Sequence, residues 1–130
     1  MQAAADGPSA TVEAALDRWF TEPFRKANPV MMDLVRGWVL ANDPAIYPTI
    51  YQVLADGVAE ISAPDIQLKV PALALTADED YGNGPEMTEA IAAGIEGAEA
   101  LVLPGLRHMA LAEDPKAVND PVRAFLETLS

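Results

Sequence analysis

The residues best suited to chemistry follow two short apolar runs in the second half of the chain. Asp78, Glu79 and Asp80 come directly after the run "VPALALTA" (70–77), and His108, the only histidine, follows the run "EALVLP" (99–104). A carboxylate that binds an imidazole fixes its tautomer and stabilises the imidazolium, while the other ring nitrogen takes a proton from a hydroxyl. These residue types, in these positions, indicate an acid–base pair that activates a nucleophile.

The same acidic residues fit a metal site poorly. In a calcium loop beginning at Asp78, Gly82 would stand where an oxygen ligand belongs and Asn83 where the turn glycine belongs. A single histidine and the absence of cysteine exclude a typical zinc site. The sequence "GNG" lacks the third glycine of a dinucleotide-binding fingerprint and predicts a turn. We therefore expect neither a metal nor a cofactor.

Strand and helix alternate in the part of the chain that carries these residues. The two apolar runs predict strands, and Pro85, after Gly84, predicts the start of a helix between them. A last helix begins at Pro115 or at Pro121. Strand, helix, strand implies a right-handed crossover and two parallel strands. Both loops then leave from the same edge of the sheet, from strands about 4.8 Å apart, so an acid and His108 are expected side by side.

The first half of the chain is predicted to be helical. A helix is expected over 11–20, and two more begin at Pro29 and Pro44, each of which follows an N-capping residue. Pro48 predicts that the third helix starts late or bends, and Gly57 predicts its end. We expect a frayed start over 1–10, a helical segment over 11–62 and a β-α-β-α unit over 63–130.

Composition excludes several classes of partner. The net charge is −12, with only eight lysines and arginines, which argues against binding to nucleic acid or to an anionic membrane surface. No apolar run approaches the roughly 20 residues of a membrane span. The sequence contains no cysteine and the first ten residues lack the features of a signal peptide, so we expect a soluble cytoplasmic protein.

The run "KVPALALTADEDYGNGPEMTEAIAAGIEGAEALVLPGLRHMALAEDP" resembles the C-terminal part of the α/β-hydrolase family. In that family a loop after one strand supplies the acid of a catalytic triad, and a loop before the last helix supplies the base. Asp80 matches the acid position, with Asp78 as the alternative, and His108 matches the base. The helical half, with "RWFTEPFR" and "DPAIYPTIYQVLADG", is similar to the cap of the branch that includes 3-oxoadipate enol-lactonases and related esterases.

The resemblance implies a serine hydrolase that cleaves a small ester or lactone through an acyl-enzyme. The family's nucleophile lies in a Gly-x-Ser-x-Gly turn upstream of the cap, whereas Ser9, Ser62 and Ser130 have no flanking glycines at that spacing. We therefore expect this chain to carry the acid and base without the nucleophile and to be inactive alone. Two strands leave open edges, which predicts a homodimer or pairing with a missing N-terminal half. The alternative is a non-catalytic remnant that acts as a self-associating interaction module.

Three further residues are candidate substrate contacts. Trp19 and Trp38 of the helical half are large apolar side chains that could line a pocket, although packing between helices is the alternative for each. Met109, directly after His108, is the third candidate, and packing in the core is the alternative for it. Arg107 either orients an anionic substrate or neutralises the acidic residues nearby.

Overall fold

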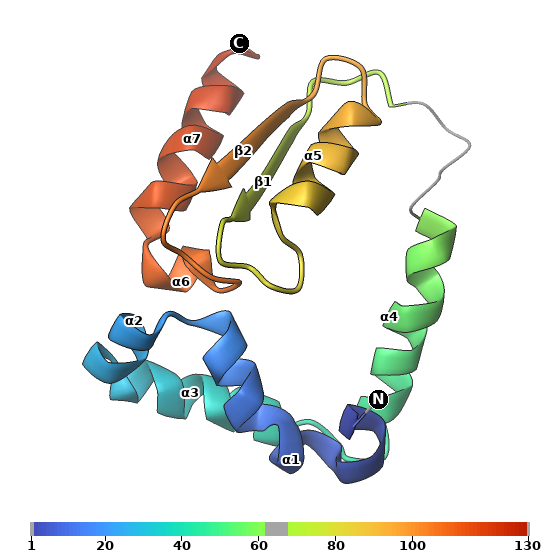
Figure 1. Cartoon of the computed structure of the whole chain (residues 1–130), viewed down its shortest axis with the longest axis vertical. Coiled ribbons are helices and arrows are strands. Elements are labelled where there is room, and N and C mark those ends of the chain that lie inside the picture. Colours follow the sequence, from blue (N-terminus) through green and yellow to red (C-terminus); the bar gives the residue numbers. More distant parts are fainter. Residues whose placement is uncertain (1, 62–67, 130) are drawn as a thin grey trace. The chain divides into compact units, whose positions relative to one another are not determined.

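The computed structural model describes residues 2–61 and 68–129, and the chain divides into two compact units (Figure 1). The first unit lies within residues 1–17 and 25–66, and the second lies within 18–24 and 67–130. The short segment 18–24 therefore packs with the second half of the sequence, although residues of the first unit flank it on both sides.

The first unit is helical, as predicted. It contains most of α1 (Gln2–Trp19), α3 (Pro29–Leu40) and α4 (Tyr47–Ile61). Arg36 of α3 donates two hydrogen bonds to the carboxylate of Glu13 in α1, at 2.6 and 3.2 Å. The buried side chains of these helices within the first unit include those of Val12, Ala15, Leu16, Met32, Val35, Val39 and Tyr47.

Two helix starts differ from the prediction. Helix α1 begins at Gln2, so residues 2–10 of the segment expected to be frayed are helical, with Pro8 inside the helix. Helix α2 (Glu22–Ala27) was not predicted, because Pro23 was expected to stop a helix. Proline is accepted in the first turn, where its missing N–H has no helical partner, so here it lies near a start.

Helix α4 shows the effect of its early proline. It begins at Tyr47, which places Pro48 in its first turn, and the preceding residues form a turn in which Asp43 accepts the N–H of Ala45 at 2.8 Å. The late start was predicted. The predicted end at Gly57 was wrong, because the helix continues to Ile61.

The second unit has the predicted β-α-β-α order. Strand β1 (Leu73–Ala77) pairs in parallel with β2 (Glu99–Leu103), and α5 (Pro85–Ala93) connects them. The short helix α6 (Ala110–Glu113) was not predicted, and α7 (Pro115–Glu127) follows it. Helices α5 and α7 lie on opposite sides of the strand pair (Figure 1).

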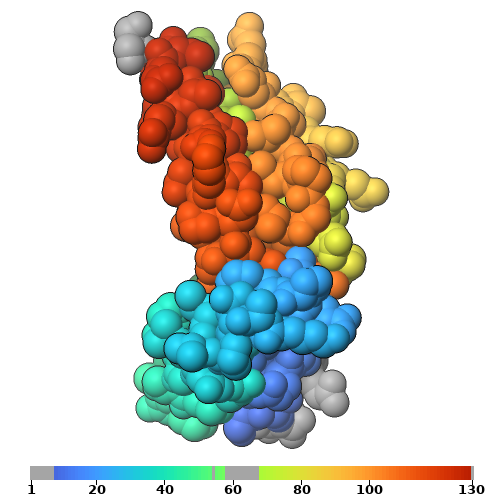
Figure 2. All heavy atoms as spheres, turned by 90° about the vertical axis from the view of Figure 1, so that its left-hand side faces the viewer, coloured from blue at the N-terminus to red at the C-terminus, as the bar shows by residue number. Residues whose placement is uncertain are grey.

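The core of the second unit lies at the carboxyl ends of the two strands. Ala77, Leu103 and Ala110 are buried there, and the partly buried side chains packed against them are those of Leu75, Leu101, Leu106 and Val118. Val118 comes from α7, and α7 forms much of one face of this unit (Figure 2). The loops that follow both strands therefore begin next to buried core residues.

Helix α7 settles which of two prolines starts the last helix. It begins at Pro115, and the carboxylate of Asp114 caps it by accepting the N–H groups of Lys116 and Ala117. Pro121 lies inside the helix. None of the helices among the described residues has the length and apolar character needed to cross a membrane.

Candidate active site

The parallel register brings the two polar loops to one edge of the sheet. Ala77 at the end of β1 is paired with Leu103 at the end of β2. The pairing continues into the loops, where the N–H of Asp78 donates to Leu103 O at 2.9 Å and the N–H of Glu79 donates to Leu106 O at 3.1 Å. The two loops are therefore held against each other by backbone hydrogen bonds.

Asp80 organises the loop that follows β1. Its Oδ1 accepts the backbone N–H groups of Gly82 and Asn83 at 2.9 and 3.0 Å. The hydroxyl of Thr76, inside β1, donates to the carbonyl of Asn83 at 2.6 Å and so folds the loop back onto the strand. These bonds fix the direction of the Asp80 side chain and leave its second oxygen for another donor.

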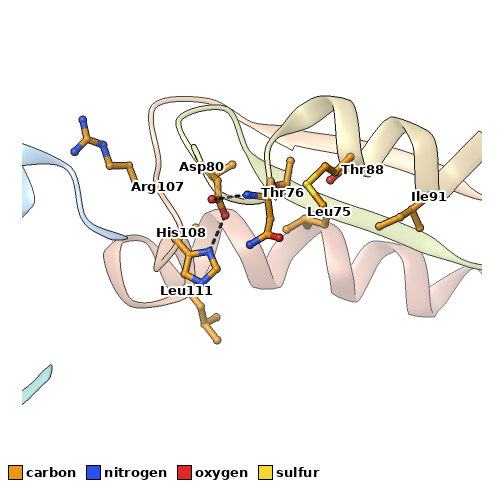
Figure 3. Close-up of a pocket in the computed structure, with 12 residues that line it drawn as sticks. Leu75, Thr76, Asp80, Thr88, Ile91, Arg107, His108 and Leu111 are labelled. Carbon is orange, nitrogen blue, oxygen red and sulfur yellow. Dashed lines mark hydrogen bonds and ion pairs between the residues drawn. The ribbon is translucent and has the colours of Figure 1, made fainter. Parts of the chain in front are cut away.

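That second oxygen faces the histidine. Oδ2 of Asp80 lies 2.8 Å from Nδ1 of His108, and Figure 3 shows the two side chains pointing toward each other. The Asp80 side chain is only 8% exposed, whereas that of His108 is 40% exposed. The carboxylate is thus enclosed by the protein, and the imidazole forms the accessible end of the pair.

The environment keeps Asp80 ionised. Burial raises the pKa of this carboxyl, but the hydrogen bonds from His108, Asn83 and Gly82 together lower it by more. The pKa of Asp80 is therefore below its ordinary value. An ionised carboxylate is only an acceptor, so it binds the imidazole tautomer that has its proton on Nδ1. The lone pair on Nε2 is then available to take a proton.

The geometry distinguishes the two candidate acids. Asp78 turns to a different donor, because its Oδ1 accepts the N–H of Gly105 at 2.7 Å. Asp80 is the acid that contacts His108.

A cavity of about 410 Å³ opens beside the pair. Its walls come from β1, α5, α6 and the loops that carry Asp80 and His108 (Figure 3). The residues that line it are Leu75, Thr76, Ala77, Asp80, Asn83, Met87, Thr88, Ile91, Arg107, His108, Ala110 and Leu111. Half of these side chains are apolar and half are polar or charged, a combination that suits a small organic molecule with polar groups.

The three predicted substrate contacts do not line this cavity. Trp19 lies near His108, with ring centroids 6.3 Å apart and planes tilted by 32°. Met109 is partly buried and is the N-cap residue of α6. Trp38 belongs to the first unit, on α3, and is 56% exposed.

Arg107 lines the cavity but its charged group is engaged elsewhere. Its Nε donates to Glu79 at 3.2 Å, its Nη1 donates to the carbonyl of Phe20 at 3.2 Å, and the guanidinium lies 5.4 Å from the centre of the Tyr81 ring. In Figure 3 the guanidinium points away from Asp80 and His108. Of the two roles expected for Arg107, the neutralisation of a nearby acid is the one that these contacts fit.

Sequence reasoning missed the polar residues that shape the loop. Thr76 is buried and holds Asn83, and its signal was a hydroxyl in an otherwise apolar strand. Leu111 was missed because α6 was not predicted.

Among the described residues no cluster of three or more histidine, cysteine or acidic side chains is arranged to hold a metal ion.

Comparison with known proteins places this geometry in context. No family model matches the chain. The (E)-2-((N-methylformamido)methylene)succinate hydrolase of Acinetobacter baylyi is 29% identical over 117 residues, which is 90% of this chain and 44% of that protein. The chain thus spans less than half the length of this curated relative.

Solved structures of a lactonase and an esterase are also similar to this chain. The enol-lactonase from Burkholderia xenovorans is 27% identical and superposes with a TM-score of 0.79 over 97% of this chain and 47% of the other. A thermophilic esterase from Thermogutta terrifontis is 24% identical, with a TM-score of 0.76 over 98% of this chain and 46% of the other. In sequence and fold, this chain corresponds to the C-terminal part of an α/β-hydrolase.

Proposed function

We propose that this chain supplies the acid and the base of a serine hydrolase that cleaves a small ester or lactone. Asp80 is the acid and His108 is the base. The observation that supports this role is the 2.8 Å contact between a buried carboxylate and an accessible imidazole at the edge of a cavity with apolar and polar walls. The similar proteins named above, a lactonase, an esterase and a hydrolase, support the reaction class.

In the proposed reaction His108 acts twice. Nε2 first takes the proton of a serine hydroxyl as the oxygen attacks the substrate carbonyl, and the imidazolium then gives that proton to the leaving oxygen. In the second step Nε2 takes a proton from water, which attacks the acyl-enzyme. Asp80 holds the ring in the required tautomer and stabilises the imidazolium through Nδ1.

The attacking serine is proposed to lie outside these 130 residues. Ser9 lies in the helical first unit, while Ser62 and Ser130 lie outside the described residues. The chain covers 44 to 47% of the length of the relatives described above, which leaves more than half of such a protein to supply a hydroxyl and an oxyanion hole.

Reconstitution tests this proposal directly. The part of the Burkholderia enol-lactonase that this chain does not cover is placed ahead of it in one polypeptide, and hydrolysis of p-nitrophenyl acetate is measured. We expect turnover in the fusion that His108→Ala abolishes, and no His108-dependent turnover in the chain alone. A fusion that is folded and equally active with and without His108 would contradict the proposed base.

The open sheet supports a second candidate, a self-associating interaction module. Within the described residues the sheet consists of β1 and β2, and a two-stranded parallel sheet of this kind has two edges that can pair with further strands. Val122, Leu126 and Leu129 also expose apolar surface at the C-terminal end of the second unit. Light scattering distinguishes the candidates: a concentration-dependent homodimer supports the module, whereas a monomer that associates only with the missing hydrolase part supports the enzyme.

A further inference from the structure

The loop that carries His108 is attached to a segment far away in the sequence. The N–H of Met109 donates to the carbonyl of Trp19 at 2.9 Å, and Nη1 of Arg107 donates to the carbonyl of Phe20 at 3.2 Å. Both neighbours of the histidine are therefore bonded to segment 18–24, which belongs to the same compact unit.

Glu113 attaches to the same segment with both of its carboxylate oxygens. One carboxylate oxygen accepts the N–H of Thr21 at 3.0 Å and the other accepts the hydroxyl of Thr21 at 2.6 Å. The two residues are 92 positions apart and both are partly buried. Hydrogen bonds to an ionised carboxylate are shorter and stronger than those between neutral groups, so this bidentate contact is a strong side-chain link between α6 and segment 18–24.

The position of Glu113 couples this contact to the imidazole. Helix α6 begins at Ala110, two residues after His108, and ends at Glu113. A displacement of Glu113 therefore moves a helix of four residues whose start directly follows the histidine loop. Since Asp80 is held by its own loop, such a movement changes the distance and angle between Nδ1 and Oδ2.

We propose that Glu113 is a positioning residue for His108. Its bidentate contact with Thr21 keeps the histidine loop in place, and this keeps Nδ1 directed at Asp80 and the tautomer fixed. The relevance to turnover rests on the proposed hydrolase function, whereas the effect on the imidazole does not.

The single histidine makes the test direct, because ¹⁵N-labelled histidine gives one imidazole in the NMR spectrum of the purified chain. In the wild type we expect the proton on Nδ1. Glu113→Ala is expected to lower the population of that tautomer in favour of the proton on Nε2. Glu113→Gln should retain most of it, because the amide oxygen accepts the Thr21 N–H and the amide nitrogen donates to the hydroxyl. Glu127→Ala, an exposed site on α7, is the matched control.

A purely structural role for Glu113 gives a different result. Glu113→Ala would then lower the unfolding temperature and leave the tautomer unchanged in the folded protein, and this outcome overturns the proposal. If Glu113→Ala does not fold, Thr21→Val decides, because it removes the hydroxyl bond and keeps the backbone bond. A reduced Nδ1–H population in Thr21→Val supports the proposal, and an unchanged one overturns it.

The active fusion gives a second, separate measurement. There Glu113→Ala is expected to lower kcat by about 10- to 100-fold with little change in KM, as for a misplaced catalytic group. If the fusion has no activity, the hydrolase proposal fails, while the tautomer measurement still decides the role of Glu113.

Discussion

Asp78 and Asp80 lie two residues apart on one loop and hold different parts of the loop opposite. Asp78 accepts the backbone N–H of Gly105 at 2.7 Å, and Asp80 contacts the imidazole of His108 at 2.8 Å. One carboxylate thus fixes the backbone of the histidine loop and the other fixes the ring. This division of roles gives a matched pair of sites for mutagenesis.

Asp80→Asn is expected to reduce kcat of the active fusion by up to about 10⁴-fold, because an amide in that place favours the wrong imidazole tautomer. Asp78→Asn is the control: its side-chain oxygen still accepts the Gly105 N–H, and kcat should stay within a few-fold of the unmutated fusion. The rate of ester hydrolysis is measured for both. Equal losses in the two variants would show that Asp80 has no special role.

The lowered pKa of Asp80 predicts how stability depends on pH. A carboxyl whose pKa is lower in the folded chain than in the unfolded chain stabilises the fold at pH values above its ordinary pKa of 3.8. That contribution is lost as the pH falls through 3.8 toward the lowered value. The difference in unfolding free energy between wild type and Asp80→Asn should therefore be largest above about pH 5 and shrink in acid. Urea denaturation between neutral pH and pH 3 measures it, and parallel curves would contradict the prediction.

The neighbouring positions of the acid and the base could be predicted, because parallel strands deliver both loops to the same edge of a sheet. The choice between Asp78 and Asp80 could not be made from spacing alone. It depends on side-chain direction, which the hydrogen bonds of Gly82, Asn83 and Thr76 determine.

For the helices, too, only those with a clear local sequence pattern could be predicted. An amphipathic segment with a proline after an N-capping residue predicted α3, and Pro48 predicted the late start of α4. The short helices α2 and α6 contain too few residues for a periodic pattern, so α6 and the contact it brings to Thr21 were missed. The link between segment 18–24 and the histidine loop joins distant parts of the chain, and no local pattern encodes it.

The cap of α7 should contribute measurably to the stability of the second unit. Asp114 accepts the N–H groups of Lys116 and Ala117 at 3.1 and 3.0 Å, and its replacement leaves both without that partner. Asp114→Ala is expected to lower the free energy of unfolding by about 1 kcal/mol. Asp120→Ala removes an exposed ion pair with Lys116 in the same helix and should have a much smaller effect. Thermal unfolding of the two variants compares them, and equal losses would argue against a capping role.

The loop that carries Asp80 also contains a glycine, Gly84, at a position with no room for a larger residue. A Cβ at Gly84 would lie 2.9 Å from the carbonyl oxygen of Asp80, a backbone atom that cannot move without shifting the acid itself. Gly84→Ala should therefore lower the free energy of unfolding by about 1–3 kcal/mol. A Cβ at Gly82 would lie 3.5 Å from Asp80 Oδ1, an ordinary contact, so Gly82→Ala should change stability by less than about 1 kcal/mol. Urea denaturation measures both, and a Gly84→Ala variant as stable as Gly82→Ala would mean that the loop can shift without cost.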